Sequence, residues 1–290
     1  MRAIVFAALA LMAPIAAAQS LLGATQIAEF TDGLAKPHDA AFSPDGKLIY
    51  LTDMANSRIR VLDAMTLRLA GSFGETELSN PHDAEFDHAG RLLVADTGND
   101  RIAIYEVNAA SAKLVGELKG LSGPEGVAIA PDGRVVVANT GSGSLSVFRD
   151  GRLERTVGRH GGADGEFASP HDVEAAPDGT LYVVDSGNHR VQVLGPDLRH
   201  RASFGASLRL NGPKYLHLEG ERIWLADENN HRILVLDRQG RSLGVLGTGR
   251  GRGPNAFYKP EAVLARDGHV WVIDTYNDRI VLLRLDTELR

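Results

Sequence analysis

The sequence of 290 residues predicts an all-β fold of the six-bladed β-propeller type, and three observations lead to this prediction. A pattern of strand, Gly-containing turn and strand recurs six times. Successive copies begin 43 to 47 residues apart, which is the length of a four-stranded repeat unit. The last copy has three strand segments, while a spare strand segment precedes the first. A closed ring of blades accounts for all three observations.

The chain begins with a segment typical of a secretory signal peptide, residues 1–18. Arg2 gives the positive start, residues 3–15 are apolar, and residues 16–18 are alanines suited to cleavage. The apolar run is too short to span a membrane comfortably, and no later run is long enough. We therefore expect a soluble exported protein, periplasmic or extracellular, whose residues 19–290 form one domain without a membrane span.

Composition narrows the classes of function. The net charge of -6 and the pI near 5.9 argue against a nucleic-acid-binding surface, which would be basic. The chain has no cysteine, so disulfides and thiolate metal sites are excluded and stability must come from the core and from ring closure. The Gly-rich segments lie between repeats and precede no helix, so we expect no nucleotide cofactor. We expect a monomer.

Each repeat opens with a proline at the start of its predicted inner strand. These prolines are Pro37, Pro81, Pro124, Pro170, Pro213 and Pro260. In the fourth repeat the strand segments are 171–176, 181–185 and 191–194, with turns at 177–179 and 186–189. Proline presets φ and glycine accepts positive φ in such turns, while the segments between them are rich in β-branched residues.

The second predicted strand of five repeats ends in the pattern D-x-x-N-x-R-[IV]. Its members are Asp53/Asn56/Arg58, Asp96/Asn99/Arg101, Asp185/Asn188/Arg190, Asp227/Asn230/Arg232 and Asp274/Asn277/Arg279. In the third repeat Asn139 and Ser144 replace the Asp and the Arg. The spacing suits an Asp that caps the turn and pairs with an Arg on the next strand. Five recurrences predict a structural role rather than a catalytic one.

The last repeat ends with a predicted strand at residues 280–285, after which the chain stops. Residues 24–31 form a strand segment that belongs to no repeat. We expect this segment to supply the missing fourth strand, which would close the ring and remove two open sheet edges.

These repeats resemble the NHL-repeat family of six-bladed β-propellers over residues 26–285. The resemblance rests on the D-x-x-N-x-R-[IV] turns, the Pro-led inner strands and the Gly-rich links before Pro170 and Pro260. It implies the propeller fold and leaves the function open, because propellers serve as enzymes, binders and scaffolds.

The residue after each leading proline begins an inner strand and faces the central channel of such a propeller. In repeat order these residues are His38, His82, Glu125, His171, Lys214 and Glu261. Folding requires no ionisable residue there, so this ring is the functional signal of the sequence. Imidazoles and carboxylates suit a zinc ion, with the two glutamates completing the shell and the lysine pairing with Glu261 or an anionic ligand. A solvated polar mouth without metal is the alternative.

The next position in each repeat extends the candidate site. Asp39, Asp83 and Asp172 could orient an imidazole, bind a hard cation such as Ca²⁺, or accept bonds from the backbone of the next blade. Tyr215 occupies the same position and is predicted to line the channel. Arg250 and Arg252, in the last Gly-rich link, could attract an anionic ligand at the rim.

The Pro-His-Asp triplets also resemble one enzymatic branch of the fold, peptidyl-α-hydroxyglycine amidating lyase. This resemblance implies that His38, His82 and His171 hold zinc and that a tyrosine in a D-x-Y turn is catalytic. Tyr276 is the match to that turn, although its turn is one residue shorter, and the Arg of that branch has no equivalent here.

Three functions follow from these patterns. The first is an exported propeller with a His-rich metal- or ligand-binding site at the channel mouth, acting on a small molecule or peptide with lyase-like or hydrolytic chemistry. The second is a non-catalytic scaffold that binds a protein, peptide or glycan of the cell envelope. The third is a lactonase-type propeller with Ca²⁺, a class that favours carboxylate and Asn ligands.

Overall fold

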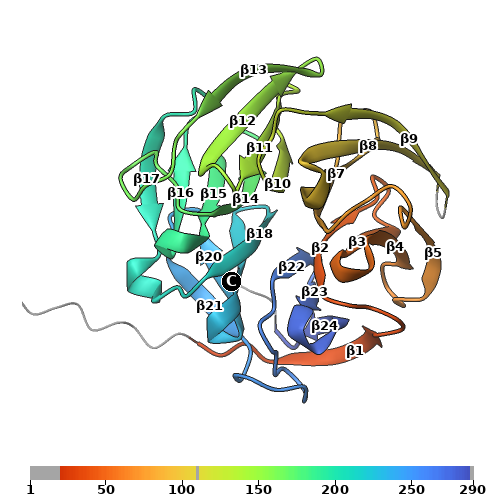
Figure 1. Cartoon of the computed structure of the whole chain (residues 1–290). Helices are drawn as coiled ribbons and strands as arrows, with labels where there is room; N and C mark the ends of the chain where they lie inside the picture. The colour runs from red at the N-terminus through yellow and green to blue at the C-terminus, as the bar shows by residue number, and fades with distance from the viewer. Residues whose placement is uncertain (1–19, 109–110, 288–290) are drawn as a thin grey trace, which may run out of the picture.

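The computed structural model describes residues 20–108 and 111–287, so the predicted signal peptide lies outside the described residues. In the described ranges, the strands form six four-stranded sheets arranged as a ring around a central channel (Figure 1). The predicted all-β, six-bladed propeller is therefore confirmed. None of the helices in these ranges is long and apolar enough to cross a membrane.

Blades 1 to 5 each contain four consecutive strands. Blade 1 contains β2 (Pro37–Phe42), β3 (Leu48–Asp53), β4 (Arg58–Asp63) and β5 (Leu69–Phe73). Blade 2 contains β6 (Pro81–Phe86), β7 (Leu92–Asp96), β8 (Arg101–Asn108) and β9 (Ser111–Leu118), and blade 3 contains β10 (Pro124–Ile129), β11 (Val135–Asn139), β12 (Ser144–Arg149) and β13 (Arg152–Val157). Blade 4 contains β14 (Pro170–Ala175), β15 (Leu181–Asp185), β16 (Arg190–Leu194) and β17 (His200–Phe204), and blade 5 contains β18 (Pro213–Glu219), β19 (Arg222–Asp227), β20 (Arg232–Asp237) and β21 (Ser242–Leu246).

Blade 6 joins the two ends of the chain. It contains β22 (Ala262–Arg266), β23 (His269–Asp274), β24 (Arg279–Leu285) and, as its outermost strand, β1 (Ala24–Phe30). β1 pairs antiparallel with β24, and the register runs from Ala24 opposite Leu285 to Phe30 opposite Ile280. The predicted closure by the N-terminal strand is therefore confirmed.

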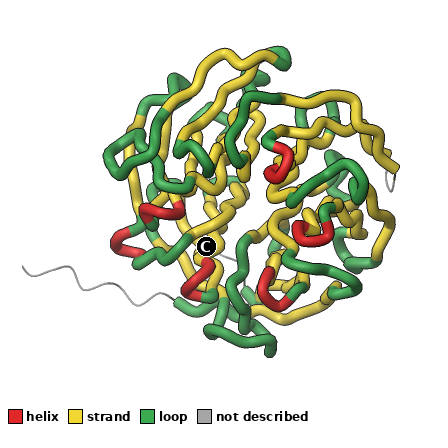
Figure 2. Tube along the Cα trace, viewed as in Figure 1, coloured by secondary structure: helices red, strands yellow, loops and turns green. Residues whose placement is uncertain are grey.

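Short 3-10 helices connect β-strands at the rims of the blades (Figure 2). They are η1 (Met54–Asn56), η2 (Thr97–Asn99), η3 (Ser186–Asn188), η4 (Ala206–Leu208), η5 (Glu228–Asn230) and η6 (Thr275–Asn277). Five of them, all but η4, lie between the Asp and the Arg of the repeated D-x-x-N-x-R-[IV] pattern. The contacts of this pattern hold the chain in its local path.

In the repeated turn, the Arg of the motif forms an ion pair with a fully buried aspartate. In blade 4 the Arg190 Nε atom donates to Asp185 Oδ2 at 2.7 Å, and the same pairing recurs in the four other blades that carry the motif. The other oxygen, Oδ1, accepts the backbone N–H of Ala168 at 2.7 Å. The predicted pairing is confirmed. The predicted cap is wrong, because the Asp makes no side-chain cap bond to its own 3-10 helix and instead anchors the preceding link.

Apolar side chains fill the space between neighbouring blades. Trp271 and Trp224 are almost completely buried, and the Trp271 indole N–H donates to the carbonyl of Ala64 at 2.7 Å, which joins blade 6 to blade 1. Packing of this kind between all neighbours leaves the inner strands to line the channel, where the polar residues lie.

Candidate functional site

The channel contains two separate cavities that share the same inner strands. The first, here called the mouth, has a volume of about 460 Å³ and is lined by all six predicted ring residues, His38, His82, Glu125, His171, Lys214 and Glu261. The second, here called the chamber, has a volume of about 350 Å³ and is lined by Asp39, Asp83, Glu85, Asp172 and Glu174. The candidate residues of the sequence are thus divided between two places.

Irregular pairing at the start of the inner strands explains this division. Consecutive side chains of a regular strand point to opposite faces of the sheet. In blades 1 and 2 the register shifts between Pro37 and Ala40 and between Pro81 and Ala84. Such a bulge redirects neighbouring side chains. A histidine can therefore face the mouth while the aspartate that follows it faces the chamber.

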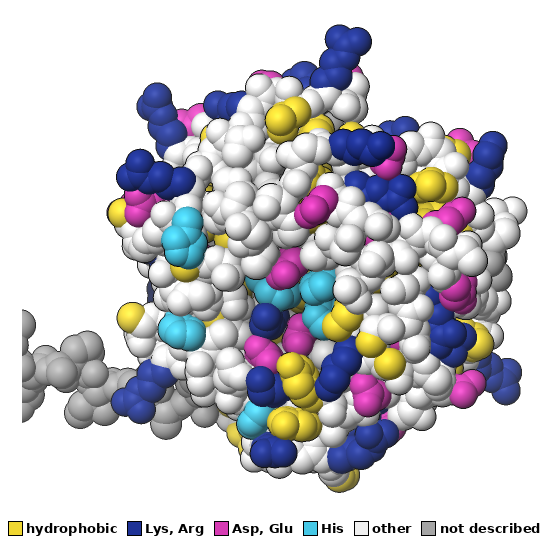
Figure 3. Space-filling view, in the orientation of Figure 1, with side chains coloured by type: hydrophobic (Ala, Val, Ile, Leu, Met, Phe, Trp, Pro, Cys, Tyr) yellow, Lys and Arg dark blue, Asp and Glu magenta, His cyan; other side chains and the backbone are white. Residues whose placement is uncertain are grey.

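Three imidazoles and two carboxylates meet in the mouth. His38 Nε2 lies 3.0 Å from Glu261 Oε2, and His171 Nε2 lies 3.0 Å from Glu125 Oε2. His82 Nε2 lies 4.0 Å from the other oxygen of Glu125. The ring centroids of His38 and His82 are 4.4 Å apart, and those of His82 and His171 are 6.3 Å apart. The three rings therefore form a continuous row across blades 1, 2 and 4. Figure 3 shows histidine side chains in the central hollow of the molecule.

Backbone carbonyls define the tautomers of two of these rings. The Nδ1 atom of His38 lies 3.1 Å from the Lys36 carbonyl, and that of His82 lies 2.9 Å from the Asn80 carbonyl. A carbonyl only accepts, so Nδ1 carries the hydrogen in the neutral ring and Nε2 presents a lone pair to the mouth. The Nδ1 atom of His171 is buried and has no partner within the described ranges.

Burial favours the neutral form of both kinds of group. It lowers the pKa of His38 and of His82 to about 4, and it lowers the pKa of His171 well below its usual value. It raises the pKa of Glu261 to about 7, against the opposing effect of nearby lysines, of which Lys214 is the strongest. Between about pH 4 and pH 7 the His38–Glu261 contact is therefore a neutral imidazole beside a mostly protonated carboxyl group, and near pH 7 about half of the Glu261 carboxyl groups are ionised.

The lysine of the ring lies near Glu228 rather than Glu261, and the predicted alternative of an anionic ligand stays a prediction. Lys214 Nζ lies 3.9 Å from Glu228 Oε2, not in an ion pair with Glu261, and Lys259 Nζ lies 3.0 Å from the other oxygen of Glu228. The sequence pattern missed Glu228 and Lys259, because they lie in η5 and in the link before blade 6 rather than on inner strands.

Tyr215 separates the two cavities. The side chain is buried, its hydroxyl donates to the Glu125 carbonyl at 3.0 Å, and its ring meets His171 edge-on at a centroid distance of 4.8 Å. Tyr215 lines the chamber, as predicted for a channel residue, and its edge supports the row of imidazoles above it.

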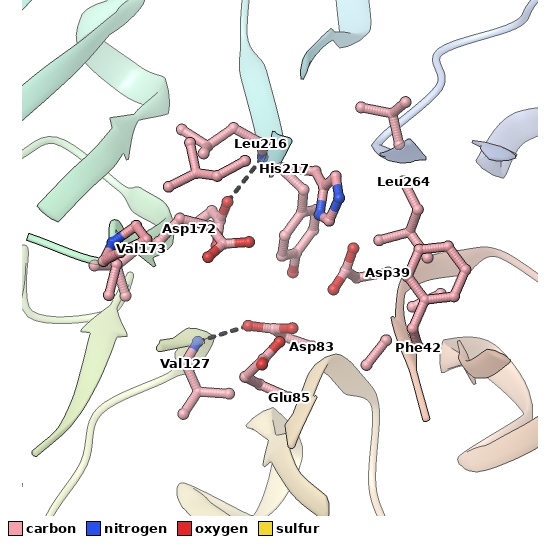
Figure 4. Close-up of a pocket in the computed structure, with 18 of the residues that line it drawn as sticks. Asp39, Phe42, Asp83, Glu85, Val127, Asp172, Val173, Leu216, His217 and Leu264 are labelled. Carbon is pink, nitrogen blue, oxygen red and sulfur yellow. Dashed lines mark hydrogen bonds between the residues drawn. The ribbon is translucent and has the colours of Figure 1, made fainter. Parts of the chain in front are cut away.

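The chamber is a cluster of carboxyl groups (Figure 4). Asp83 Oδ2 accepts the backbone N–H of Val127 at 2.6 Å, and Asp172 Oδ2 accepts that of Leu216 at 2.8 Å, so each aspartate binds the next blade. Asp39 points into the cavity toward Asp83. Burial raises the pKa of every carboxyl in the cluster, and it raises that of Glu85 to about 8 with help from the charge of Asp83.

Two acidic residues that line the chamber were not among the candidate residues predicted from the sequence. Glu85 and Glu174 lie two positions after Asp83 and Asp172, and strand alternation brings residues i and i+2 to the same side. The repeated spacing H-D-x-E in blades 2 and 4 was the signal that could have identified them.

The remaining predicted residues lie at the edge of the mouth or away from it. Tyr276 lines the mouth and is 37% exposed. Arg250 lies over the ring of Tyr258, and Arg252 pairs with Glu29 of β1 at 3.3 Å. Neither arginine lines the mouth, so the structure does not bring these two residues together with the histidines.

The donor chemistry of the mouth matches a zinc site, whereas the spacing is wider than a closed coordination shell. A backbone carbonyl on Nδ1 is the usual orienting partner of a metal-binding histidine. Among the residues that the structure describes, however, no group of three or more His, Asp or Glu side chains is arranged to hold one ion. The rings would have to move toward one another to bind one.

Comparison with known sequences identifies the repeats. The NHL repeat matches at residues 121–148 and 167–194, which lie in blades 3 and 4 and the links before them. NHL repeat-containing protein 3 from Homo sapiens is 31% identical over 181 residues, which is 54% of this chain and 49% of that protein. Protein SUPPRESSOR OF QUENCHING 1, chloroplastic, from Arabidopsis thaliana is 23% identical over 262 residues, 70% of this chain and 25% of that protein. The chain thus spans about half and about a quarter of these two relatives.

Solved structures share the fold at low identity. An auxiliary nutrient binding protein from Bacteroides ovatus has a TM-score of 0.66 and 16% identity over 94% of this chain and 74% of its own. A catalytically inactive variant of virginiamycin B lyase from Staphylococcus aureus, solved with quinupristin, has a TM-score of 0.62 and 14% identity over 88% of this chain and 83% of its own. The repeat matches and the six closed sheets together show that the chain carries NHL repeats and folds as a six-bladed β-propeller, in agreement with the predicted NHL-repeat resemblance, and the related NHL protein supports it.

Proposed function

We propose that this protein is an exported propeller, with residues 19–290 as one domain, that binds a small molecule or peptide at the mouth. The observation that carries the proposal is the row of His38, His82 and His171, whose side chains come from three blades and converge on one cavity. Gathering three buried imidazoles in one cavity lowers the stability of the fold, because buried polar groups lose their hydration. A binding role accounts for it.

In this proposal the three histidines hold a divalent metal, with zinc as the first candidate. The lone pairs on Nε2 of His38 and His82 are available to an ion, and Glu125 and Glu261 already lie 3.0 Å from an imidazole nitrogen. That separation is near the roughly 3.3 Å expected between two ligands of one tetrahedral zinc ion. A modest movement of the rings would complete the arrangement.

The chain's own groups support lyase-like or hydrolytic chemistry in the mouth. A bound zinc ion would supply Lewis-acid polarisation of a carbonyl group. With Glu125 as the carboxylate ligand, Glu261 would remain free to hold or release a proton as a general acid or base, and burial raises its pKa to about 7 in the metal-free chain. Tyr276, at the edge of the same cavity, is the further candidate for proton transfer.

A second candidate function is ligand binding without catalysis. Two of the solved structures that share the fold, with TM-scores of 0.66 and 0.67, are auxiliary nutrient binding proteins. The mouth volume of about 460 Å³ lies within the usual range for small-molecule sites. In this alternative the imidazoles and glutamates bind the ligand directly by hydrogen bonds.

Metal analysis separates the two functions. The mature protein, purified without a histidine tag, is expected to contain or take up about one zinc per chain, and His82→Ala or His171→Ala should weaken uptake at least about tenfold. His88→Ala is the matched control, because His88 is exposed in a turn outside the channel. If wild-type protein takes up no Zn²⁺, Cu²⁺ or Ca²⁺ in stoichiometric amount, the metal site is wrong and ligand binding without metal replaces it.

A further inference from the structure

Basic and aromatic side chains line the mouth together with the histidines. Lys36, Lys214 and Glu228 lie beside the histidines in this cavity, together with Tyr276. Figure 3 shows lysine or arginine side chains next to the histidines and acidic groups of the central hollow. Lys36 and Lys214 therefore place positive charge in the same cavity as the imidazoles.

The carboxylates of the mouth leave Lys36 without an ion-pair partner among the described residues and give Lys214 only a long contact. Glu228 is 6% exposed and forms its short contact, 3.0 Å, with Lys259, while Lys214 lies 3.9 Å away from it. Glu125 and Glu261 each lie 3.0 Å from a histidine nitrogen. The described residues place no carboxylate within ion-pair distance of Lys36, whose Nζ lies 3.6 Å from the ring centroid of Tyr276.

A series of cation–aromatic contacts begins in the mouth at Lys36 and Tyr276 and continues to Arg250. Lys36 and Lys259 both lie over Tyr276, at 3.6 and 4.9 Å from its centroid, and Tyr276 meets Tyr258 edge-on at 5.5 Å. Arg250 lies 4.2 Å over Tyr258. These contacts hold positive charge at the entrance of the mouth although the whole chain is acidic. Such a local field steers anions into a cavity.

We propose that the ligand of the mouth is an anion, whose carboxylate or phosphate group is held between Lys36 and Lys214 while the rest of the molecule faces the imidazoles. The proposal rests on the proposed function in using the same cavity as the binding site, and it requires no metal. An ammonium group binds either kind of anion as a point charge. Partial burial strengthens the attraction compared with an exposed lysine.

Calorimetric titration of the metal-free chain tests this inference. The probes are inorganic phosphate and succinate, with succinamide as an uncharged analogue of the second. We expect at least one anion to bind, binding to weaken as ionic strength rises, and succinamide not to bind. Lys36→Met or Lys214→Met should weaken binding about tenfold, the value of one charge-assisted hydrogen bond. A response to phosphate alone or to succinate alone identifies the anionic group.

Lys113→Met is the matched control, because it removes the same charge from an exposed position on β9. Absence of binding by both anions at about 10 mM would overturn the inference, since affinity weaker than that is negligible. Equal weakening by Lys113→Met would also overturn it, because net charge and not the mouth would then be responsible. Anion binding without zinc uptake removes the metal proposal alone, and zinc uptake without anion binding removes this inference alone.

Discussion

The mouth and the chamber are lined by the same inner strands of the ring, yet they differ in how their charges are balanced. In the mouth, His38 and His171 each lie 3.0 Å from a glutamate, and lysines lie nearby. In the chamber, five carboxyl groups face one cavity, and none of them forms an ion pair within the described residues. Both cavities thus contain buried ionisable groups, but these groups have different neighbours: cations lie nearby in the mouth, and other carboxyl groups lie nearby in the chamber.

Burial favours the neutral form of the ionisable groups in both cavities, and neighbouring charges change the size of each pKa shift. It lowers the pKa of the imidazoles and raises the pKa of the carboxyls, because it disfavours whichever form is charged. Glu261 in the mouth has a pKa raised to about 7, and Glu85 in the chamber has one raised to about 8. Lys214 lowers the pKa of Glu261, whereas the charge of Asp83 raises that of Glu85 further. The difference shows that cations, rather than depth alone, distinguish the two cavities.

Opening the ring should abolish both cavities, and we expect this to be the largest effect. Deleting residues 20–31 removes β1, exposes the edge of β24 and loses the packing of Ala24 and Phe30. The expected cost is about 5 kcal/mol or more, which is comparable to the whole stability of a domain. Thermal unfolding followed by circular dichroism measures it. Ile27→Ser, at a 43% exposed position of the same strand, should change the melting temperature little, and an unchanged melting temperature in the deletion would refute the closure.

The buried aspartate of blade 4 should matter for stability and not for binding. Asp185→Ala removes the carboxylate that Arg190, Asn188 and Gln192 share as an acceptor and leaves the Arg190 charge without its ion pair, so we expect a loss of about 3–5 kcal/mol in urea unfolding. Blade 3 provides the control, because Asn139 and Ser144 occupy the equivalent positions there. Asp185→Asn combined with Arg190→Ser should therefore cost less than Asp185→Ala. Selective loss of anion or metal binding at full stability would contradict the structural role.

The repeats made the fold predictable from sequence, since six copies supply independent evidence for each strand and turn. The unpaired strand at the start and the three-stranded last copy together predicted the closure that β1 and β24 form. The cap was not predictable in the same way, because an Asp before a turn can bond either its own turn or a distant backbone N–H. In blade 4 the distant group, the N–H of Ala168, is the one bound.

The site was predictable in its members and not in its arrangement. Equivalence of six positions was enough to place His38, His82 and His171 around one cavity. The sequence contains no sign of the register shifts at Pro37 and Pro81, so it could not show that the next residue faces a second cavity. Lys36 and Lys259 were missed because they lie in links, which approach the mouth only once the ring is closed.

Ionisation of buried Glu85 should make the stability of the folded protein fall as pH rises. Its pKa is about 8 in the folded protein and ordinary, near 4.5, in the unfolded chain. Between these values the folded state binds the extra proton, so stability falls as pH rises from about 4.5 to 8. Glu85→Gln should remove the part of this slope that Glu85 contributes and stabilise the protein at pH 8 by about 1–3 kcal/mol, with little effect at pH 5.

Urea unfolding of both proteins at pH 5 and pH 8 measures this difference. Glu106→Gln is the control, because Glu106 is exposed on β8 and outside the channel. Parallel pH dependence in wild type and Glu85→Gln would mean that Glu85 is not the group that loses its proton in this range, and the contrast between chamber and mouth would disappear.

The smallest expected effect is a change in histidine pKa values when one positive charge is removed from the mouth only. It tests directly whether the mouth and the chamber differ in their electrostatic environment. Lys214 lowers the pKa of His38 and of His171, after the larger effect of burial, because its charge repels the protonated rings. Lys214→Met should therefore raise the pKa of both, as followed by nuclear magnetic resonance titration of the imidazole protons. His217 lines the chamber, and its pKa is lowered by burial and by Arg266 instead, so it should not respond. Lys113→Met should leave all three unchanged. A shift of His217 equal to that of His38 would show that the two cavities share one electrostatic environment despite the side chain of Tyr215 between them.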